Sequence, residues 1–402
     1  MNTISKTKLA ANKRAPISER TITLLNAQSA CRCQFRGCNA DLSKDVLTNR
    51  KVNLAHIAHI VAAKHDGPRG NDPMPVEDRN HISNLMLVCM VHHKIIDDKS
   101  QEADFPKELL LDYKKEHENR IAALTSISAE RQTVVLRMFG RIRGNIVNVS
   151  GNEVSKTVFE SEGRYPFYLQ GTDQIEIDLS SLPENDEHAY WQSAKAMIND
   201  VLHRQVFPGI EKGRIKHLSV FSLSRISLLA FFGYELGDKV PVDLYQKHRD
   251  ANEGWNWQTS GQPVEFICTT LRNGSDKKKV ALLLSVSGKV PENEVPLMPD
   301  EGYTVYEMLP VDVQPGRTVI STKADLLNFR NTYQAFLRQV ERVHGSSAEL
   351  YLFPAVPAPV AVICGRELLR GVSPVVTLHE KNTDTYYPTI KINQYDTERI
   401  LN

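Results

Sequence analysis

The sequence has 402 residues, of which 41% are hydrophobic and 24% charged, and its formal net charge is +1. A chain of this length exceeds the roughly 250–300 residues at which a single hydrophobic core stops growing, so two or three globular domains are expected. No stretch reaches the about 18 uncharged apolar residues of a membrane helix, and no apolar segment follows the N-terminal lysines. We therefore expect a cytoplasmic protein with no membrane partner.

The cysteines and the basic residues each indicate a kind of partner. Six cysteines are too few for a disulfide scaffold, and four of them lie near histidines, which in a reducing compartment indicates metal binding. Residues 1–50 carry nine Lys or Arg against three Asp or Glu. This basic excess favours a polyanionic partner, although it is also typical of a solvated N-terminus.

The N-terminal part predicts a small mixed domain. Apolar spacing predicts helices over 17–31 and 105–124, and a Val- and Ile-rich stretch predicts a strand over 52–57. The segment 84–89 is short and apolar, so it fits either a second strand or a helix. A tight turn is expected between Cys33 and Cys38, and a loop through Gly67, Pro68, Arg69 and Gly70.

The pattern changes beyond residue 120. Residues 121–150 lack strong periodicity and are interpreted as a linker. Strands and helices then alternate, which predicts an α/β domain over 151–402. The expected strands are 175–179, 215–222, 264–270, 280–286, 349–354 and 375–379. The expected helices are 189–203, 226–236, 324–343 and 360–369.

An internal repeat divides this second domain. HLSVFSLSRISLLAFFGYEL (217–236) and ELYLFPAVPAPVAVICGREL (349–368) share the spacing Phe-x11-Gly-x2-Leu at an offset of 132 residues. Each segment is expected to form a strand, a loop and a helix. We interpret the pair as a duplicated α/β unit, with halves at about 151–260 and 261–402.

Ligands of open α/β sheets bind where strands end and helices begin. This rule predicts a ligand site at Ser222, Arg225, Ser287, Gly288, Pro354 and Ala355. The alternative is that these residues only form turns. Trp255 and Trp257, at i and i+2, either stack on a nucleotide base or anchor a core face.

Two short pairs near the N-terminus predict a structural zinc site. Cys33-x4-Cys38 and Cys89-x2-His92 have the close spacing of tetrahedral Zn²⁺ ligands, with Cys31 as a substitute for Cys33. His59, Asn84, His93 and Asp97 remain once the zinc is satisfied. They supply a general base and ligands for one catalytic divalent cation, as phosphodiester hydrolysis requires.

The order His59, Asn84, His93 between zinc pairs resembles the HNH endonucleases, which have a ββα-metal fold. The segments AHIVAAKHDGPRG and RNHISNLMLVCMVHHKIID carry the resemblance, which covers about residues 30–120 of an expected nuclease domain at 1–120. It implies that His59 is the general base, that Asn84 braces the loop and that His93 binds Mg²⁺ or a similar cation. Ala58 stands where many HNH enzymes have an acidic metal ligand. His56 is therefore a candidate metal ligand with Asp97, and the AHIAHI repeat also leaves His56 as an alternative base.

Residues 151–402 resemble the SAVED domain, a fused pair of Rossmann or CARF-like units that senses cyclic oligonucleotides. The repeated segments, LLLSVSG and the WNW sequence carry this resemblance. Together the two parts resemble the HNH–SAVED effectors of CBASS anti-phage defence. This implies a homodimer or tetramer, activated by a cyclic di- or trinucleotide, that degrades double-stranded DNA with little sequence preference. A modification-dependent restriction endonuclease and a catalytically dead zinc DNA-binding module are the alternatives.

Overall fold

The computed structural model describes residues 16–126, 128–142, 144–147, 149–167, 174–183, 187–248 and 254–394. The chain divides into two compact units, Met1–Ser128 and Ala129–Asn402, here called the N-terminal and C-terminal units. In the described part of the chain, no helix is long and apolar enough to cross a bilayer.

The N-terminal unit has three α-helices and a two-stranded antiparallel sheet in its described residues. The elements are α1 (Glu19–Ser29), β1 (His56–His59), β2 (Leu85–Val88), α2 (Met90–Ile96) and α3 (Lys107–Thr125). One-turn 3₁₀ helices cover Val76–Asp78, Ile82–Asn84 and Lys99–Gln101. The helices expected over 17–31 and 105–124 are confirmed, and the segment 84–89 forms strand β2.

The strand expected over 52–57 lies further along the chain than predicted. Residues 52–54 are bonded to 42–43, because the Val52 and Leu54 amides donate to Ser43 O and Leu42 O. Strand β1 begins at His56 and pairs instead with β2, with His56 opposite Val88 and His59 opposite Leu85. The predicted strand therefore divides: residues 52–54 bond to residues 42–43, and the chain from His56 onward pairs with β2.

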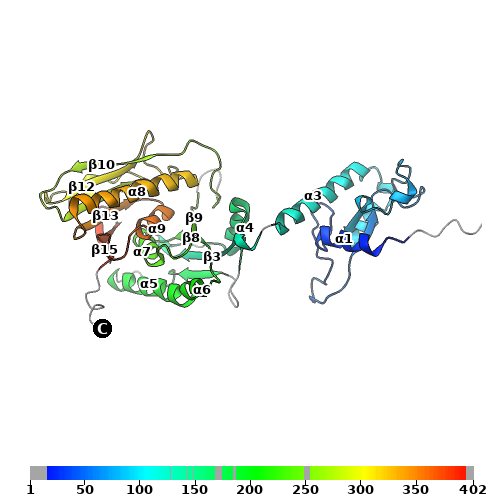
Figure 1. The fold of residues 1–402 in the computed structure, drawn as a ribbon, viewed down its shortest axis with the longest axis horizontal. Helices are drawn as coiled ribbons and strands as arrows, with labels where there is room; N and C mark the ends of the chain where they lie inside the picture. Colours follow the sequence, from blue (N-terminus) through cyan, green and yellow to red (C-terminus); the bar gives the residue numbers. More distant parts are fainter. Residues whose placement is uncertain are drawn as a thin grey trace, which may run out of the picture. The chain divides into compact units, whose positions relative to one another are not determined.

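The C-terminal unit contains two mainly parallel sheets (Figure 1), which confirms the α/β expectation. In the first sheet the order is β6-β3-β8-β9, with β7 also paired to β3, and all pairings are parallel. Its strands are β3 (Gln132–Phe139), β6 (Tyr165–Pro166), β7 (Ile175–Asp178), β8 (Leu218–Leu223) and β9 (Val242–Tyr245).

The second sheet has the order β10-β12-β11-β13-β14-β15, with parallel inner strands and antiparallel strands at both edges. Its strands are β10 (Phe266–Arg272), β11 (Lys279–Ser285), β12 (Thr304–Pro310), β13 (Glu349–Ala355), β14 (Val375–Lys381) and β15 (Tyr386–Ile392). A short hairpin joins β4 (Arg141–Ile142) and β5 (Asn145–Ile146).

Helices connect and cover the strands. They are α4 (Gly151–Glu162), α5 (Glu187–Val201), α6 (Phe207–Glu211), α7 (Ile226–Leu236), α8 (Lys323–His344) and α9 (Ala358–Arg366), with a π-helical turn at Leu202–Val206 between α5 and α6. The four helices expected from the sequence correspond to α5, α7, α8 and α9. Strands β6, β12 and β15 and helices α4 and α6 were not predicted, whereas β9 follows Pro241, where the sequence after the first repeat indicates a strand.

The linker expected over 121–150 is wrong. This range contains β3, which pairs with β6, β7 and β8 inside the first sheet. A strand covered on both faces reads as a continuous apolar run rather than an alternation, and TVVLRMF lies between polar segments. The C-terminal unit therefore begins near residue 129 rather than 151, and its first half includes β3.

The two repeated segments have the same local structure and contact each other. Strand β8 leads into α7, strand β13 leads into α9, and the two helices pack together between the sheets (Figure 1). A methyl group on Gly233 would clash with Val362 O, and one on Gly365 would clash with Ala230 O. Val362 and Gly365 lie 132 residues beyond Ala230 and Gly233, so the contact is reciprocal at the offset of the repeat.

Candidate functional site

A cluster of three cysteines and one histidine joins two distant segments of the N-terminal unit. The ligand atoms of Cys33, Cys38, Cys89 and His92 all lie within 4.8 Å of one another. Cys33 and Cys38 flank a tight turn, in which the Cys38 amide donates to Phe35 O at 3.0 Å. Cys89 is the N-cap of α2, which places His92 in the first turn of that helix.

This donor set fits zinc. Three thiols and one imidazole are the ligands of many structural tetrahedral zinc sites. Burial raises the pKa of the Cys33 thiol to about 12, so a cation is needed to hold it as a thiolate. Cys31 lies outside the cluster, and its thiol donates instead to Asn26 Oδ1 at 3.5 Å. The sequence alternative with Cys31 in place of Cys33 is therefore not the arrangement in the structure.

Asn84 closes the loop between β1 and β2. Its side chain is buried, accepts a hydrogen bond from the Val61 amide at 2.8 Å and donates to Val61 O and Arg79 O at 2.9 Å each. These bonds fix the backbone directly after His59 to the end of the loop. Asn84 therefore braces the loop between β1 and β2 rather than a loop between a strand and a helix, and its part in catalysis stays a prediction.

The two histidines of AHIAHI differ in exposure and surroundings. His59 is 6% exposed, and its Nε2 lies 2.9 Å from Asn80 Oδ1. His56 is exposed, and its ring centroid lies 5.2 Å from that of His93. His93 Nε2 in turn lies 3.6 Å from Asp97 Oδ2. The structure thus brings His56, His93 and Asp97 together and places His59 beside Asn80.

The His56, His93 and Asp97 group is looser than the zinc cluster. Within the described ranges, only the four Cys and His ligands form a metal-type group with all donor atoms within 4.8 Å. Imidazole nitrogens suit Ni²⁺ as well as Zn²⁺, whereas Mg²⁺ and Mn²⁺ are suited by oxygen ligands such as carboxylate and water. The donor set therefore fits a divalent cation that completes its shell with water or phosphate oxygens.

Sequence reasoning missed three residues that shape this region. Asn80 contacts His59, and two buried arginines tie the loop to its surroundings. Arg69 donates to Ile60 O at 2.5 Å and to Ile96 O at 2.8 Å, while Arg79 donates to Ala62 O at 2.8 Å and Gly70 O at 3.0 Å. Arginine in a polar loop usually points to solvent, so the sequence carried no signal for these roles.

The expected ligand residues of the C-terminal unit lie partly at one sheet edge. Ser287, Gly288, Pro354 and Ala355 follow or end the neighbouring parallel strands β11 and β13, and the Ser287 amide donates to Ala355 O at 2.7 Å. A methyl group on Gly288 would meet no atom within 4 Å, so this edge is open there. Ser222 is different, because it is 2% exposed inside β8.

Arg225 lies at the N-cap of α7 and is held by aromatic rings. Its guanidinium carbon is 4.4 Å from the Tyr190 ring centroid and 5.1 Å from that of Trp191. One residue after the start of α7, the Ser227 amide donates to Glu380 Oε1 on β14 at 2.6 Å. Burial raises the pKa of the Glu380 carboxyl, and Arg225 opposes that shift. The start of α7 therefore depends on the second sheet.

Both tryptophans of the WNW sequence belong to the core. Trp255 is 2% exposed and packs edge-on against Phe221, while Trp257 is 7% exposed and donates from Nε1 to Leu244 O at 3.1 Å. Neither indole face is open to a nucleotide base. Of the two interpretations of this sequence, the core one matches the structure and the stacking one does not.

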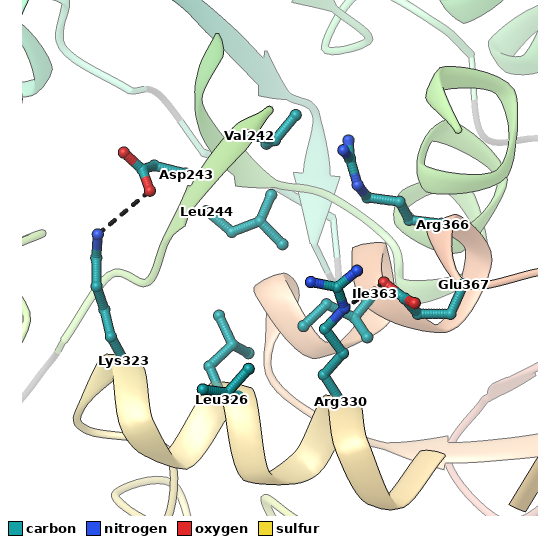
Figure 2. A pocket seen from close by; sticks show the side chains of 10 residues that line it. Val242, Asp243, Leu244, Lys323, Leu326, Arg330, Ile363, Arg366 and Glu367 are labelled. Carbon is teal, nitrogen blue, oxygen red and sulfur yellow. Dashed lines mark hydrogen bonds and ion pairs between the residues drawn. The ribbon is translucent and has the colours of Figure 1, made fainter. Parts of the chain in front are cut away.

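A separate cavity of about 230 Å³ lies between β9, α8 and α9 (Figure 2). Its acidic residues are already paired: Asp243 with Lys323 at 3.3 Å, and Glu367 with Arg330 at 2.6 Å. None of the ligand residues expected from the sequence lines it. The cavity is smaller than the roughly 300–1,000 Å³ of most small-molecule sites, so it does not replace the open sheet edge as the candidate ligand site.

Comparisons with known proteins show which family the C-terminal unit resembles. Residues 198–392 match the family model described as SAVED, the SMODS-associated and fused to various effectors sensor domain. No curated protein matches the chain.

Solved Cap4 SAVED/CARF-domain containing receptors are similar. That of Acinetobacter baumannii with the cyclic trinucleotide 3'3'3'-cAAA is 12% identical, with a TM-score of 0.40 over 80% of this chain and 68% of that chain. The same receptor with 2'3'3'-cAAA is 11% identical, with a TM-score of 0.41 over 80% and 67%. The receptor of Moraxella osloensis is 12% identical, with a TM-score of 0.33 over 73% and 59%. By the family match, the C-terminal unit carries a SAVED sensor domain over residues 198–392.

Proposed function

We propose that this protein is a DNA endonuclease switched on by a cyclic oligonucleotide in anti-phage defence. The observation that carries the proposal is the presence of two kinds of unit on one chain. Residues 198–392 match a SAVED sensor domain. In the N-terminal unit, strand β1 and helix α2 carry His59 and His93 beside a Cys₃His cluster. A degradative nuclease needs a gate, and a sensor domain on the same chain can supply one.

In the proposed reaction His59 is the general base. With Asn80 Oδ1 as acceptor, the His59 proton lies on Nε2, and Nδ1 is then the nitrogen that would take a proton from the attacking water. Asn84 holds the backbone that follows His59, so the ring cannot drift with the loop. His56 remains the alternative base because it is the more exposed of the two.

His56, His93 and Asp97 would hold the divalent cation. When bound, such a cation stabilises the charge that develops on the phosphate and on the leaving 3′ oxygen. Asp97 also orients His93, and the helix α2 that carries both is fixed by Cys89 and His92. The zinc cluster thereby positions the cation ligands without taking part in the chemistry.

The sensor half of the proposal places a cyclic di- or trinucleotide at the carboxyl edges of β8, β11 and β13. Arg225 offers a guanidinium to a phosphate, and the open backbone at Gly288 allows close approach. Activation requires the ligand to prefer the active assembly, a homodimer or tetramer. A hundredfold preference supplies about 2.7 kcal/mol.

Plasmid digestion tests the proposal. Full-length protein with Mg²⁺ or Mn²⁺ should cut supercoiled plasmid only when the right member of a panel of cyclic di- and trinucleotides is present. Cutting that needs modified DNA and ignores the panel would instead make the protein a modification-dependent restriction enzyme. DNA binding without cutting under any condition would make it a zinc DNA-binding module.

A further inference from the structure

A hairpin at residues 42–54 of the N-terminal unit has no role in the site described above. Lys44 and Lys51 face each other as an antiparallel bridge, and the Val52 and Leu54 amides donate to the opposite arm at 3.1 and 2.9 Å. The Asp45 amide donates to Arg50 O at 2.9 Å and closes the tip. Residues 45–50 therefore form the crown of a bonded hairpin rather than a loose loop.

The crown holds two apolar side chains in solvent. Asp45 Oδ1 accepts from the Thr48 amide at 2.8 Å and from its hydroxyl at 2.7 Å, and the Asn49 amide donates to Asp45 O at 2.9 Å. In this frame Val46 is 74% exposed and Leu47 is 91% exposed. Burial of such side chains is favourable, so a hydrogen-bonded turn that holds both in solvent suggests a covering partner.

Cations surround this apolar crown. Lys44, Arg50 and Lys51 are exposed, and in the described part of the chain no acidic group pairs with the side chains of Arg50 or Lys51. Lys44 reaches only Asp41, at 3.9 Å. An apolar tip whose two arms carry three exposed cations complements a polymer that has stacked bases inside and phosphates outside.

The hairpin is continuous with the candidate catalytic strand. Residues 51–54 and His56 are exposed, so solvent-facing side chains run from the hairpin to the start of β1. Lys51 and His56 are five positions apart in the sequence, at most about 18 Å of extended chain. One turn of DNA measures roughly 34 Å, so a duplex placed on His56 and His93 also reaches the hairpin.

We propose that the hairpin grips double-stranded DNA, with Leu47 and Val46 inserted between base pairs in the minor groove and Lys44, Arg50 and Lys51 on the flanking phosphates. Apolar wedges of this kind unstack a base step and bend the duplex, which opens the backbone to attack. The proposal rests on the proposed DNA substrate, but it concerns binding and can be measured without cleavage.

The test uses full-length protein with Ca²⁺ in place of Mg²⁺, and a duplex that carries 2-aminopurine, with and without the cyclic-oligonucleotide panel. Wild-type protein should raise the 2-aminopurine fluorescence. Leu47→Ser should abolish that rise and weaken binding about tenfold, the effect of roughly 1.4 kcal/mol. Lys51→Gln should lower the slope of log affinity against log salt by about one.

Leu369→Ser is the matched control, because Leu369 is 61% exposed in the C-terminal unit and should leave both signals unchanged. Unaltered melting and zinc content would show that the hairpin variants fold. Wild-type affinity of Leu47→Ser for DNA would overturn the proposal, as would Leu47-dependent binding only to phosphatidylserine vesicles. A Leu47-dependent fluorescence rise in a protein that never cuts DNA would uphold the hairpin proposal and refute the nuclease.

Discussion

The two units are stabilised in different ways. The N-terminal unit has a small apolar core around Leu25, Ile60, Leu87 and Leu110, and its long connections are tied by buried polar groups and by the Cys₃His cluster. The C-terminal unit packs its two sheets and the α7–α9 contact around one large apolar core, and a separate smaller cluster with Ala281, Leu283 and Phe353 lies on the other face of the second sheet.

This difference bears on the two proposed roles, which are catalysis in the N-terminal unit and ligand sensing in the C-terminal unit. In the N-terminal unit the Cys₃His cluster and the buried polar side chains that stabilise the fold lie next to the residues proposed to react. Loss of the metal or of one of these polar groups should therefore reduce both stability and activity. In the C-terminal unit tight apolar packing joins the two halves, and a small change at a strand end can shift helices that have little room to adapt.

Loss of a zinc ligand should produce the largest effect. Cys89→Ser removes one of four ligands, and structural zinc contributes apparent binding free energies of about 10–16 kcal/mol in small domains. We expect the N-terminal unit to unfold while the C-terminal unit stays intact, as measured by limited proteolysis and metal analysis. Cys31→Ser is the matched control and should behave as wild type. Equal protease resistance of Cys89→Ser and wild type would show that the unit does not depend on the cluster.

Removal of the proposed base should leave both units folded but stop cleavage. His59→Ala is expected to lower the cleavage rate about 10²–10⁴-fold. Asn80→Ala should cost less, because it only releases the His59 ring, and its effect should disappear in the His59→Ala background. The exposed His188 of the C-terminal unit provides a control, His188→Ala. If His56→Ala loses all activity and His59→Ala loses none, the roles of the two histidines are reversed.

The contact between the repeated helices is the weak point of the C-terminal unit. Gly365→Ala places a methyl group against Ala230 O and should destabilise this unit by about 1–3 kcal/mol or more, with Gly233→Ala acting similarly. Gly316→Ala is the control, because its methyl group would meet only Gln314 O at 3.7 Å. Denaturant unfolding measures the difference. Unchanged midpoints for both variants would mean that the helices separate at little cost.

Acid should weaken the C-terminal unit gradually. Burial lowers the pKa of both His217 and His379 from 6.5 to about 4, so the unfolded chain binds more protons between these values. Stability is then complete above pH 6.5 and falls towards pH 4, by up to about 1.4 kcal/mol per pH unit for each histidine. His217→Gln should flatten this slope in urea titrations between pH 7 and 5, whereas His188→Gln should not. An equally steep slope in His217→Gln would assign the acid sensitivity to other groups.

Prediction from the sequence was most accurate for the zinc ligands, because cysteine and histidine are rare residues and lie close together there. The pairs Cys33 with Cys38 and Cys89 with His92 have spacings that only a shared ion explains easily, and the structure brings all four together. The repeat of 132 residues also predicted the two strand, loop and helix segments, although not that Gly233 and Gly365 form their contact.

Prediction failed where the outcome depends on distant partners. Strand β3 looked like a linker because its neighbours β7 and β8 begin about 40 and 80 residues later. Trp255 and Trp257 fitted either a stacking site or a core face, and only their contacts with Phe221 and Leu244 decide between the two. The bond from His59 to Asn80 crosses 21 residues of loop, and no local pattern encodes it.

The most direct test of the central claim is the rate of plasmid linearisation by the full-length protein, measured with and without each cyclic oligonucleotide under Mg²⁺ or Mn²⁺. The account predicts cutting that depends on one or a few of these molecules and that His59→Ala abolishes. Equal rates with and without every cyclic oligonucleotide, or no cutting under any condition, would contradict it.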